Sequence, residues 1–582
     1  MLRLLAIAIP VALLTACAAQ APVAPPQDSI APVTTTAVVP ERPFPHDSLY
    51  ALLVAEFALR RGAYDVALEQ YRAQAPALRD PAVSAHTTRL TQYLHRDEAT
   101  LEAAELWVEL APDDMEARNS LARQLVASGR GAEALPHLAE IERHGHGANF
   151  PLVLTNFERL TNVQRTALAA DVDRLAREFP DNTSLLFTQA LLLHEMTQDD
   201  QALRKLDRLF SLEPEQVQAL LLEGRILSAQ GKANPYARIE KVLKENPDDN
   251  ALRLRYARLL ATSDMAAARD QFELLWAQAP EDTDLLYSLA LINREIGDNA
   301  TASVYLRKML QLGQRVNAAQ YYLGRIEEDN NNPDAALDHY QAVGPGQEYL
   351  AAGSRIGHIL VDSGQLERAN AWFTVQRDSY PEQREPLIGL QAELLNTAGY
   401  REDAMALLDT ALEQTPEATT LLYSRAMLRE QHDDLTAMET DLRAILALDA
   451  DNATALNALG YTLANRTRRF AEALELVSRA LALEPDEPAI LDSMGWVLYR
   501  LGRIEESLTY LTRAYAAFPD AEVAAHLGEV LWVSGDTRRA TQVWQEAARV
   551  DPDHPVLRDT LERLQVRLPN TPAPAPMIDT DR

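Results

Sequence analysis

Cysteine is nearly absent from this chain of 582 residues, which carries a single one, Cys17. One thiol cannot form an intramolecular disulfide, and a zinc site built from several cysteines is excluded as well. Glycine is sparse, with 22 residues, and aromatic residues make up only 6% of the chain. Because 47% of the residues are hydrophobic and Ala and Leu are abundant, the composition excludes a wholly disordered chain and favours helices over strands.

Positive charge is also in deficit, since the formal net charge is −30. Such a chain repels phosphate backbones, which argues against nucleic-acid binding. It repels anionic membrane surfaces too, so any membrane contact needs a separate anchor. No segment after Cys17 is apolar enough to span a bilayer, which takes about 20 apolar residues. We interpret most of the acidic residues as the solvated outer face of a helical body.

The first residues have the features of a secretory signal. Arg3 supplies the positive start, and the apolar stretch from Leu4 to Leu14 is too short to cross a bilayer. It ends in the sequence Leu14-Thr15-Ala16-Cys17. This sequence resembles the lipobox of bacterial lipoproteins, in which a peptidase cuts before the cysteine and the cysteine is then acylated. The resemblance implies a lipid anchor on Cys17, and Ala rather than Asp at position 18 implies the periplasmic leaflet of the outer membrane.

Composition divides the chain into four parts. Residues 1–16 are the expected signal peptide, and residues 17–47 are the lipidated cysteine followed by a spacer rich in Pro and Ala. Prolines prevent a continuous helix there and favour an extended, semi-rigid segment. Residues 48–568 are expected to form the folded body. Residues 569–582 make up a second Pro- and Ala-rich segment that is predicted to be disordered.

A pattern of about 34 residues recurs through the body. Near the C-terminus Gly460, Gly495 and Gly528 are separated by 35 and 33 residues, and the prolines at 485, 519 and 552 keep a similar spacing. Within the block 488–520, apolar residues recur at helical spacing on two segments, and Gly502 marks the turn between them. Each block therefore predicts two helices, with Asp520 as the cap of the next one.

This pattern resembles the motif of the tetratricopeptide repeat family, which has small residues at its eighth, twentieth and twenty-seventh positions. Matching pairs include Ala190 with Ala202 and Gly324 with Ala336, whereas residues 149–181 and 250–281 are degenerate. The resemblance implies an all-α solenoid, a right-handed superhelix of about fifteen helix-turn-helix units from Ser48 to Asp553. A closing helix is predicted at Val556–Leu568, and in this family the first helix of each unit lines the concave surface.

The sequence lacks the catalytic, metal-binding and phosphate-binding motifs for which we searched. The sequence His144-Gly145-His146 has no further metal ligands close by, and the glycines at 224 and 231 are too far apart for a phosphate loop. There is no Gly-x-Ser-x-Gly sequence. We therefore expect no catalytic residue, no metal and no cofactor, and a protein that is not an enzyme.

Aromatic residues gather on the predicted concave positions of the last three units. The residues placed there are Tyr461, Trp496, Tyr499 and Trp532, with Asn457, Asp492, Arg500, His526 and Glu529 among them. Trp, Tyr and Arg dominate binding hot spots, so these positions predict a groove for a peptide or a partner helix. The alternative is that the Trp and Tyr side chains fill the core between repeats.

Basic residues recur on the corresponding positions of four earlier units. They are Arg225, Arg258, Arg294 and Arg325, with Tyr287 and Tyr321 beside them. On so acidic a chain, a basic stripe would steer an acidic partner or the C-terminal carboxylate of another chain. Ordinary salt bridges to neighbouring Glu and Asp are the alternative.

The whole layout resembles the pseudomonad lipoproteins that bind the periplasmic carboxyl-terminal processing protease. The segments Leu456–Gly460, Ile490–Trp496 and Ala525–Glu529 carry the resemblance beyond the general repeat. It implies an adaptor that brings a protease together with substrates such as peptidoglycan hydrolases. The rival interpretations are a structural component of an envelope or polysaccharide-export assembly, and an enzyme whose site the sequence does not display.

Overall fold

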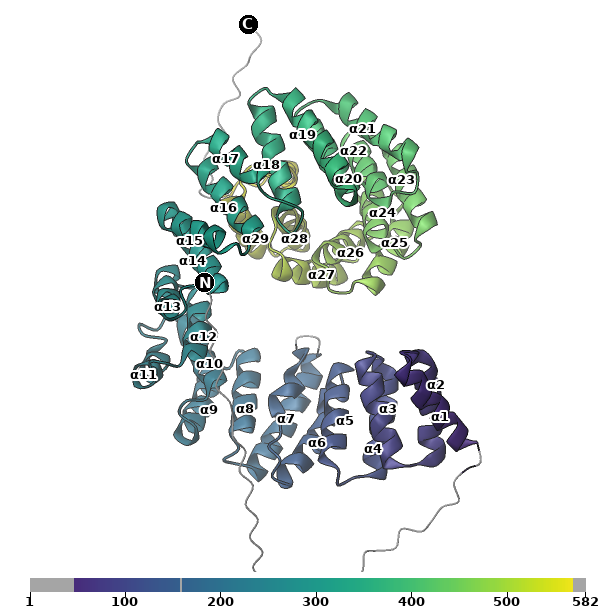
Figure 1. The fold of residues 1–582 in the computed structure, drawn as a ribbon, viewed down its shortest axis with the longest axis vertical. Helices are drawn as coiled ribbons and strands as arrows, with labels where there is room; N and C mark the ends of the chain where they lie inside the picture. Colours follow the sequence, from purple (N-terminus) through teal and green to yellow (C-terminus); the bar gives the residue numbers. More distant parts are fainter. Residues whose placement is uncertain (1–44, 46, 158–159, 569–582) are drawn as a thin grey trace, which may run out of the picture. The chain divides into compact units, whose positions relative to one another are not determined.

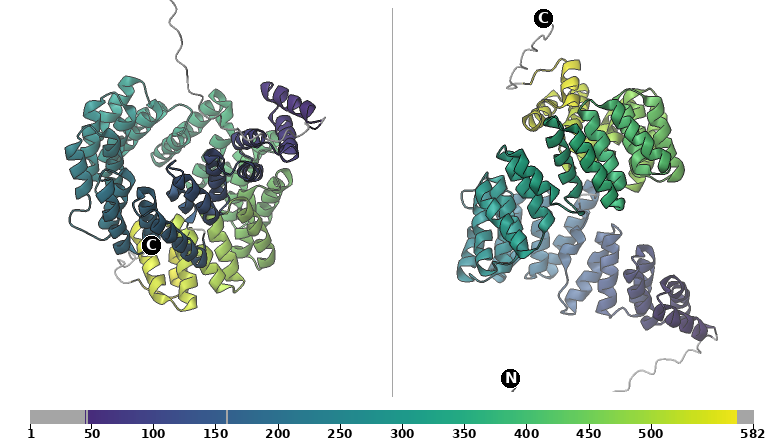
Figure 2. Two further views of the ribbon diagram at one scale, coloured as in Figure 1. Left: turned by 90° about the horizontal axis from the view of Figure 1, so that it is seen from below. Right: turned by 45° about the horizontal axis from the view of Figure 1, so that its top comes forward.

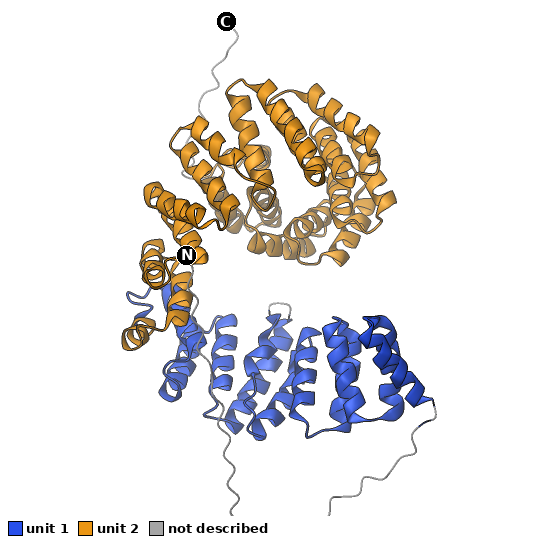
Figure 3. Cartoon of the chain, viewed as in Figure 1, with its two compact units in different colours: residues 1–237 blue, residues 238–582 orange. Residues whose placement is uncertain are grey.

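The computed structural model describes residues 45, 47–157 and 160–568, and every regular element in them is a helix. The chain divides into two compact units, residues 1–237 and 238–582, which Figure 3 shows in different colours. Within each unit, consecutive helices pack side by side in chain order (Figures 1 and 2). The predicted all-helical repeat fold is confirmed.

Unit 1 carries the helices up to α10. They are α1 (Ser48–Arg60), α2 (Tyr64–Leu78), α3 (Pro81–Tyr93), α4 (Asp97–Leu110), α5 (Met115–Ala127), α6 (Gly131–Arg143), the 3₁₀ turn η1 (Phe150–Leu154), α7 (Asn162–Glu178), α8 (Thr183–Glu195), α9 (Asp199–Leu212) and α10 (Val217–Ala229).

Unit 2 begins at the second residue of α11 and contains the remaining helices. Its helices are α11 (Ala237–Glu245), α12 (Asn250–Leu260), α13 (Met265–Gln278), α14 (Thr283–Glu295), α15 (Asn299–Leu312), α16 (Val316–Asp329), α17 (Pro333–Gln341), α18 (Tyr349–Asp362), α19 (Leu366–Ser379), η3 (Pro381–Gln383), α20 (Arg384–Thr397), α21 (Arg401–Gln414), α22 (Thr419–Gln431), α23 (Leu435–Leu448), α24 (Ala453–Arg466), α25 (Phe470–Leu483), α26 (Pro488–Arg500), α27 (Ile504–Ala517), α28 (Ala521–Ser534), α29 (Thr537–Val550) and α30 (Pro555–Arg563).

In chain order these elements form fifteen pairs, from α1 with α2 to α28 with α29, and α30 follows them. The first element of the fourth pair is the short turn η1, which accounts for the degenerate motif at 149–181. Residues 250–281, although degenerate in sequence, form the ordinary pair α12 and α13. The closing helix is shorter than predicted. It ends at Arg563 because Gln565 adopts a left-handed backbone (φ 55°), which interrupts the helical hydrogen bonds.

Glycines at the eighth position let paired helices approach closely. A β-carbon on Gly495 would lie 2.5 Å from Leu511 Cγ of α27, and one on Gly528 would overlap the Trp544 indole of α29. Asp520 caps α28 as predicted, because its carboxylate accepts a hydrogen bond from the backbone N–H of Glu522 at 2.8 Å. Helix α28 ends at Ser534 and is followed by Gly535 in the left-handed region, with a φ of 98°.

The first helices of the last pairs are buried on nearly all sides. In α28 every residue from Val523 to Leu531 is buried, including His526 and Glu529. In Figure 1, α20, α22, α24 and α26 lie on the inner side of the curve that unit 2 makes, with α21, α23 and α25 outside them. The inner side therefore carries the first helices of these pairs.

The predicted signal peptide, Cys17, the predicted spacer up to residue 44 and the segment 569–582 lie outside the described residues. Among the helices that are described, none combines the length and the apolar character that a membrane crossing demands.

Candidate protein-binding surface

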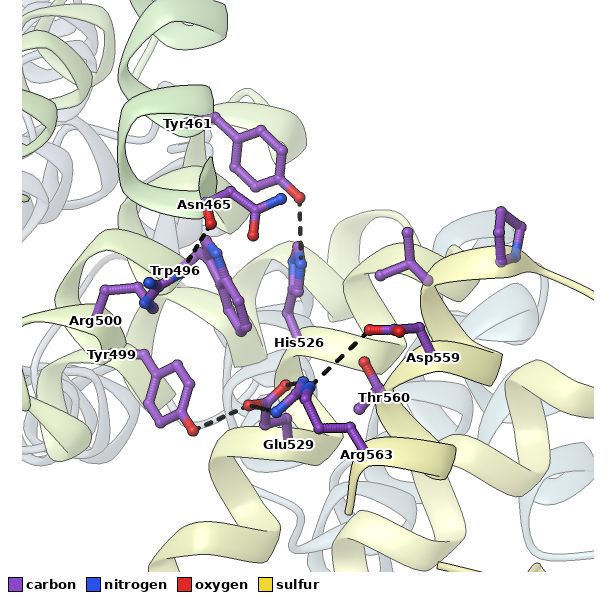
Figure 4. A pocket seen from close by; sticks show the side chains of 12 residues that line it. Tyr461, Asn465, Trp496, Tyr499, Arg500, His526, Glu529, Asp559, Thr560 and Arg563 are labelled. Atoms are coloured by element: carbon purple, nitrogen blue, oxygen red, sulfur yellow. Dashed lines mark hydrogen bonds and ion pairs between the residues drawn. The ribbon is translucent and has the colours of Figure 1, made fainter. Parts of the chain in front are cut away.

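Four helices of unit 2 line an open cavity of about 790 Å³ at the C-terminal end of the repeats. Side chains from α24, α26, α28 and α30 line it, as Figure 4 shows. Six residues that the sequence placed on the concave wall meet here, namely Tyr461, Trp496, Tyr499, Arg500, His526 and Glu529. We call this space the aromatic cavity.

His526 stands at the centre of the aromatic cavity with 2% of its side chain exposed. Its ring stacks on Trp496 with 4.2 Å between centroids, and its Nδ1 lies 2.9 Å from a carboxylate oxygen of Asp492. Although burial disfavours the charged ring, the carboxylates of Asp492, Glu522 and Glu529 raise the pKa of His526 above its ordinary value. The imidazole is therefore held between an aromatic face and a carboxylate that favours its protonated form.

Tyr461 joins α24 to α28 across the intervening repeat. Its hydroxyl donates to Glu522 at 2.8 Å and lies 3.4 Å from His526 Nε2. Burial, together with the negative charge of Glu522 and Asp492, raises the pKa of Tyr461, so the hydroxyl remains a donor. This contact links residues more than sixty positions apart in the chain.

Glu529 is the centre of a second buried set of hydrogen bonds in the aromatic cavity, apart from the one around His526. Arg563 of α30 donates two hydrogen bonds to its carboxylate, at 2.9 and 2.6 Å, and the Tyr499 hydroxyl donates a third at 3.0 Å. Burial and the Glu529 charge raise the pKa of Tyr499 to about 12. Asp559, Thr560 and Arg563 of α30 also line the cavity, although the sequence predicts this segment only as a closing helix. Nothing in the repeat motif marks them.

Trp496 both packs and lines the cavity. Its side chain is 6% exposed, and its ring lies 5.2 Å from that of Tyr499. The indole Nε1 is buried and has no hydrogen-bond acceptor among the described residues. Arg500 follows on the next turn, where it donates to the Asn465 carbonyl at 3.1 Å and covers the Phe470 ring.

Trp532 does not line the aromatic cavity. It packs instead against the core of the last pair, with its ring 5.8 Å from that of Trp544. The position of Trp532 in its helix predicted a place on the concave wall. That prediction does not hold for the last pair, because no further full repeat follows α28.

A second cavity of about 650 Å³ lies on the other side of Tyr461, which lines both. We call it the acidic cavity. Its walls come from α22, α24, α26, the start of α28 and the turns between them. The lining includes apolar residues such as Met427, Ile490 and Phe518 and six carboxylates, but no Lys, Arg or His. Its carboxylates are Glu430, Glu484, Glu487, Asp492, Asp520 and Glu522.

The four arginines of the predicted stripe have different surroundings. Arg225 and Arg258 are exposed, and neither forms an ion pair with the part of the chain that the structure describes. Arg294 pairs with Asp329 at 3.8 Å and lies over the Tyr322 ring. Arg325 pairs with Glu328 at 4.0 Å, and hydrogen bonding to Tyr321 raises its pKa. Tyr287 packs against Tyr322 with 5.9 Å between ring centroids. Arg225 belongs to unit 1 and the other three to unit 2.

Within the described ranges, no three His, Cys, Asp or Glu side chains are arranged to hold a metal ion. His144 and His146 lie on the turn after α6, where both are exposed.

Comparison with known proteins points to one family. A family model described as Tetratricopeptide repeat matches residues 287–348, 439–488 and 493–555. A TPR repeat-containing protein of Pseudomonas aeruginosa is 39% identical over 510 residues, which cover 86% of this chain and 86% of that protein. Human tetratricopeptide repeat protein 13 is 32% identical over 84 residues, or 14% of this chain and 10% of that protein.

Two solved structures share the helical repeat at low sequence identity. Yeast Tom70 is 15% identical with a TM-score of 0.31, and the match covers 89% of this chain and 95% of that one. A thermophilic TPR protein of Thermus thermophilus is 19% identical with a TM-score of 0.29, and the match covers 31% of this chain and 100% of that one.

Proposed function

Because the chain belongs to the tetratricopeptide repeat family, whose members are typically non-catalytic scaffolds, we propose that it is a lipid-anchored periplasmic adaptor. It binds partner proteins on the inner side of its repeats and brings a carboxyl-terminal processing protease together with substrates such as peptidoglycan hydrolases. Protein binding as such agrees with the family. The protease, its substrates and the outer membrane are the finer part of the proposal.

The aromatic cavity is the observation that carries the proposal. Tyr461, Trp496 and Arg500 line it together, and these residue types supply most of the binding free energy at protein interfaces. The buried donor Trp496 Nε1 has no acceptor among the described residues, so a carbonyl of a partner entering here would satisfy it. The hydrogen bonds from Arg563 and Tyr499 to Glu529 fix the opposite wall before a partner arrives.

An adaptor accelerates proteolysis without chemistry of its own. Holding a protease and a substrate on one frame converts their encounter into an intramolecular one, which raises apparent affinity by factors of about 10² to 10⁴. We therefore expect the purified protein to hydrolyse nothing, and to speed a protease only when both partners are bound. Peptide or glycan cleavage by the purified protein alone contradicts the adaptor.

The binding test compares two arginines three positions apart. Arg500→Ala removes a side chain from the aromatic cavity. Arg503→Ala removes one that is exposed and that pairs, among the described residues, only with Glu506 beside it. Each full-length variant is purified from detergent-solubilised envelopes, and the copurifying proteins are identified. The adaptor predicts a protease and hydrolases that are lost with Arg500→Ala and kept with Arg503→Ala. An export complex, or no partner at all, overturns the proposal.

The anchor is tested separately with Cys17→Ser. Several acyl chains on one residue hold a protein durably, at about 0.8 kcal/mol per buried CH₂. The variant should keep the circular dichroism of the parent and appear in the soluble periplasmic fraction. If it still sediments with the outer membrane in a strain that lacks its partners, the lipid anchor is wrong.

A further inference from the structure

The acidic cavity differs from the aromatic cavity in its charge. The aromatic cavity holds two guanidinium groups, Arg500 and Arg563, among its carboxylates. The acidic cavity holds six carboxylates without a basic side chain. The other polar lining residues are uncharged at neutral pH, and among them the side-chain oxygen of Asn457 is buried without a donor among the described residues. A ligand suited to this space therefore brings donors and positive charge.

Most of these carboxylates already have partners inside the protein. Glu430 pairs with Arg466 at 3.0 Å, Asp492 with His526 at 2.9 Å, and Glu522 accepts from Tyr461 at 2.8 Å. Asp520 caps α28. Glu484 and Glu487 are left on the turn between α25 and α26, both exposed. Neither forms an ion pair with the part of the chain that is described, so their charge is free to meet a cation.

Apolar surface accompanies the free charge. Phe518, directly after α27, lines the cavity and is 58% exposed. Tyr423 and Met427 of α22 are half-buried on the facing wall, and Ile490 and Val523 lie deeper. Covering an exposed aromatic ring with a partner is favourable, because it removes apolar surface from water. The cavity therefore suits an occupant that is apolar as well as cationic.

We propose that the acidic cavity docks a peptide segment of a partner protein that carries Lys or Arg beside large apolar residues. The apolar side chains cover Phe518 and Met427, and the ammonium or guanidinium group lies against Glu484 and Glu487. This assignment rests on the proposed adaptor function and adds the chemistry of one partner. It is opposite in sign to the acidic partner that the arginine stripe predicts.

A displayed library of random decapeptides, selected on the immobilised full-length protein in detergent, tests the charge preference without knowledge of the partner. We expect Lys or Arg next to Leu, Ile, Met or an aromatic residue to be enriched among the binders. Replacing that basic residue by Glu in a synthesised binder should abolish measurable binding, and affinity should fall as salt rises. Binders that are acidic, or that show no enrichment of basic residues, overturn the proposal, as does a selection without binders.

Paired variants place the binding in this cavity. Glu484→Gln with Glu487→Gln should weaken a selected basic peptide by about 2- to 10-fold and flatten its salt dependence, because exposed ion pairs each contribute little. Glu413→Gln with Glu417→Gln removes two glutamates that are equally exposed but lie outside the cavity, and should change neither. Phe518→Ala should weaken binding further while the unfolding midpoint stays constant. Equal affinities of the two double variants overturn the site.

The two proposals fail separately. If the double variant Glu484→Gln, Glu487→Gln still copurifies with protease and hydrolases and binds the basic peptide as before, the cavity assignment is wrong and the adaptor stands. If the peptide binds as expected but no protease copurifies with the parent protein, the adaptor fails and the docking chemistry stands.

Discussion

In the last repeats, the first helices carry aromatic residues at the positions where those of four earlier repeats carry arginines. The two sets nevertheless have different surroundings. Tyr461, Trp496 and His526 converge on one cavity through contacts between α24, α26 and α28. Arg294 and Arg325 pair with nearby carboxylates, whereas Arg258 remains exposed without an ion pair in the described chain. A repeated position thus predicts which face a residue occupies, but not what it contacts.

The difference arises from the last repeats being closed by additional contacts. Tyr461 reaches past α26 to Glu522 and His526, and Arg563 of α30 covers Glu529. In a solenoid most contacts are between neighbouring repeats, so a contact across a whole repeat ties three of them together. We infer that the aromatic cluster stabilises the C-terminal repeats as well as shaping a surface, whereas the exposed arginines can contribute only to binding.

Trp496→Ala should give the largest effect. Removing a buried Trp leaves a cavity and typically costs about 3–5 kcal/mol of stability. The loss should be confined to the C-terminal repeats, which hydrogen exchange of α24 to α29 resolves from the rest of the chain. Partner affinity is then measured on the fraction that remains folded. Unchanged exchange in these helices would mean that the stacking of Trp496 on His526 contributes nothing to the fold.

Arg563→Ala should have a smaller effect on the same repeats. It leaves the buried Glu529 carboxylate with Tyr499 alone, and because Arg563 is itself half exposed we expect a loss of about 1–2 kcal/mol. Arg558→Ala, on the exposed side of α30, is the matched control and should change nothing. Adding Glu529→Gln to Arg563→Ala should recover part of the loss, since an amide needs no counter-charge. A denaturant-unfolding double-mutant cycle without coupling would contradict the role of the pair.

Much of this organisation could be predicted from the sequence, and the exceptions share a physical reason. Helical periodicity, the capping Asp520 and the close-packing Gly528 depend on a few neighbouring residues, so the helix pairs and their number followed from the repeat. The aromatic cavity depends on Tyr461 meeting Glu522 sixty-one residues later, and the acidic cavity on turns outside the motif. Trp532 packs against Trp544 in the core of the last pair, where no further full repeat follows.

His526 predicts that the last repeats lose stability as pH rises. The groups facing it are Tyr461 of α24, Asp492 and Trp496 of α26, and Glu522 and Glu529 of its own helix. Because the folded state raises its pKa above 6.5, the protonated ring contributes stability that is fully present below pH 6.5 and is lost as pH rises through the folded value. Unfolding of α24 to α29 should therefore become easier toward alkaline pH, and His526→Gln should remove this slope. A variant with the parent's pH profile would assign the slope to other groups.

Arg258→Glu should give the smallest structural effect and decides whether the arginines form a binding surface. The side chain is exposed and forms no ion pair with the described residues, so the unfolding midpoint of the variant should equal that of the parent. If an acidic partner passes over this helix, reversing the charge should weaken its affinity by about 3- to 10-fold at low salt, and the difference should vanish as salt rises. Arg255→Glu, three residues earlier on α12 and equally exposed, controls for the change in net charge. The stripe predicts that only the first substitution matters for binding. Equal losses from both would show that net charge alone steers the partner, and no loss from either would leave Arg294 and Arg325 as ordinary salt bridges of the repeat.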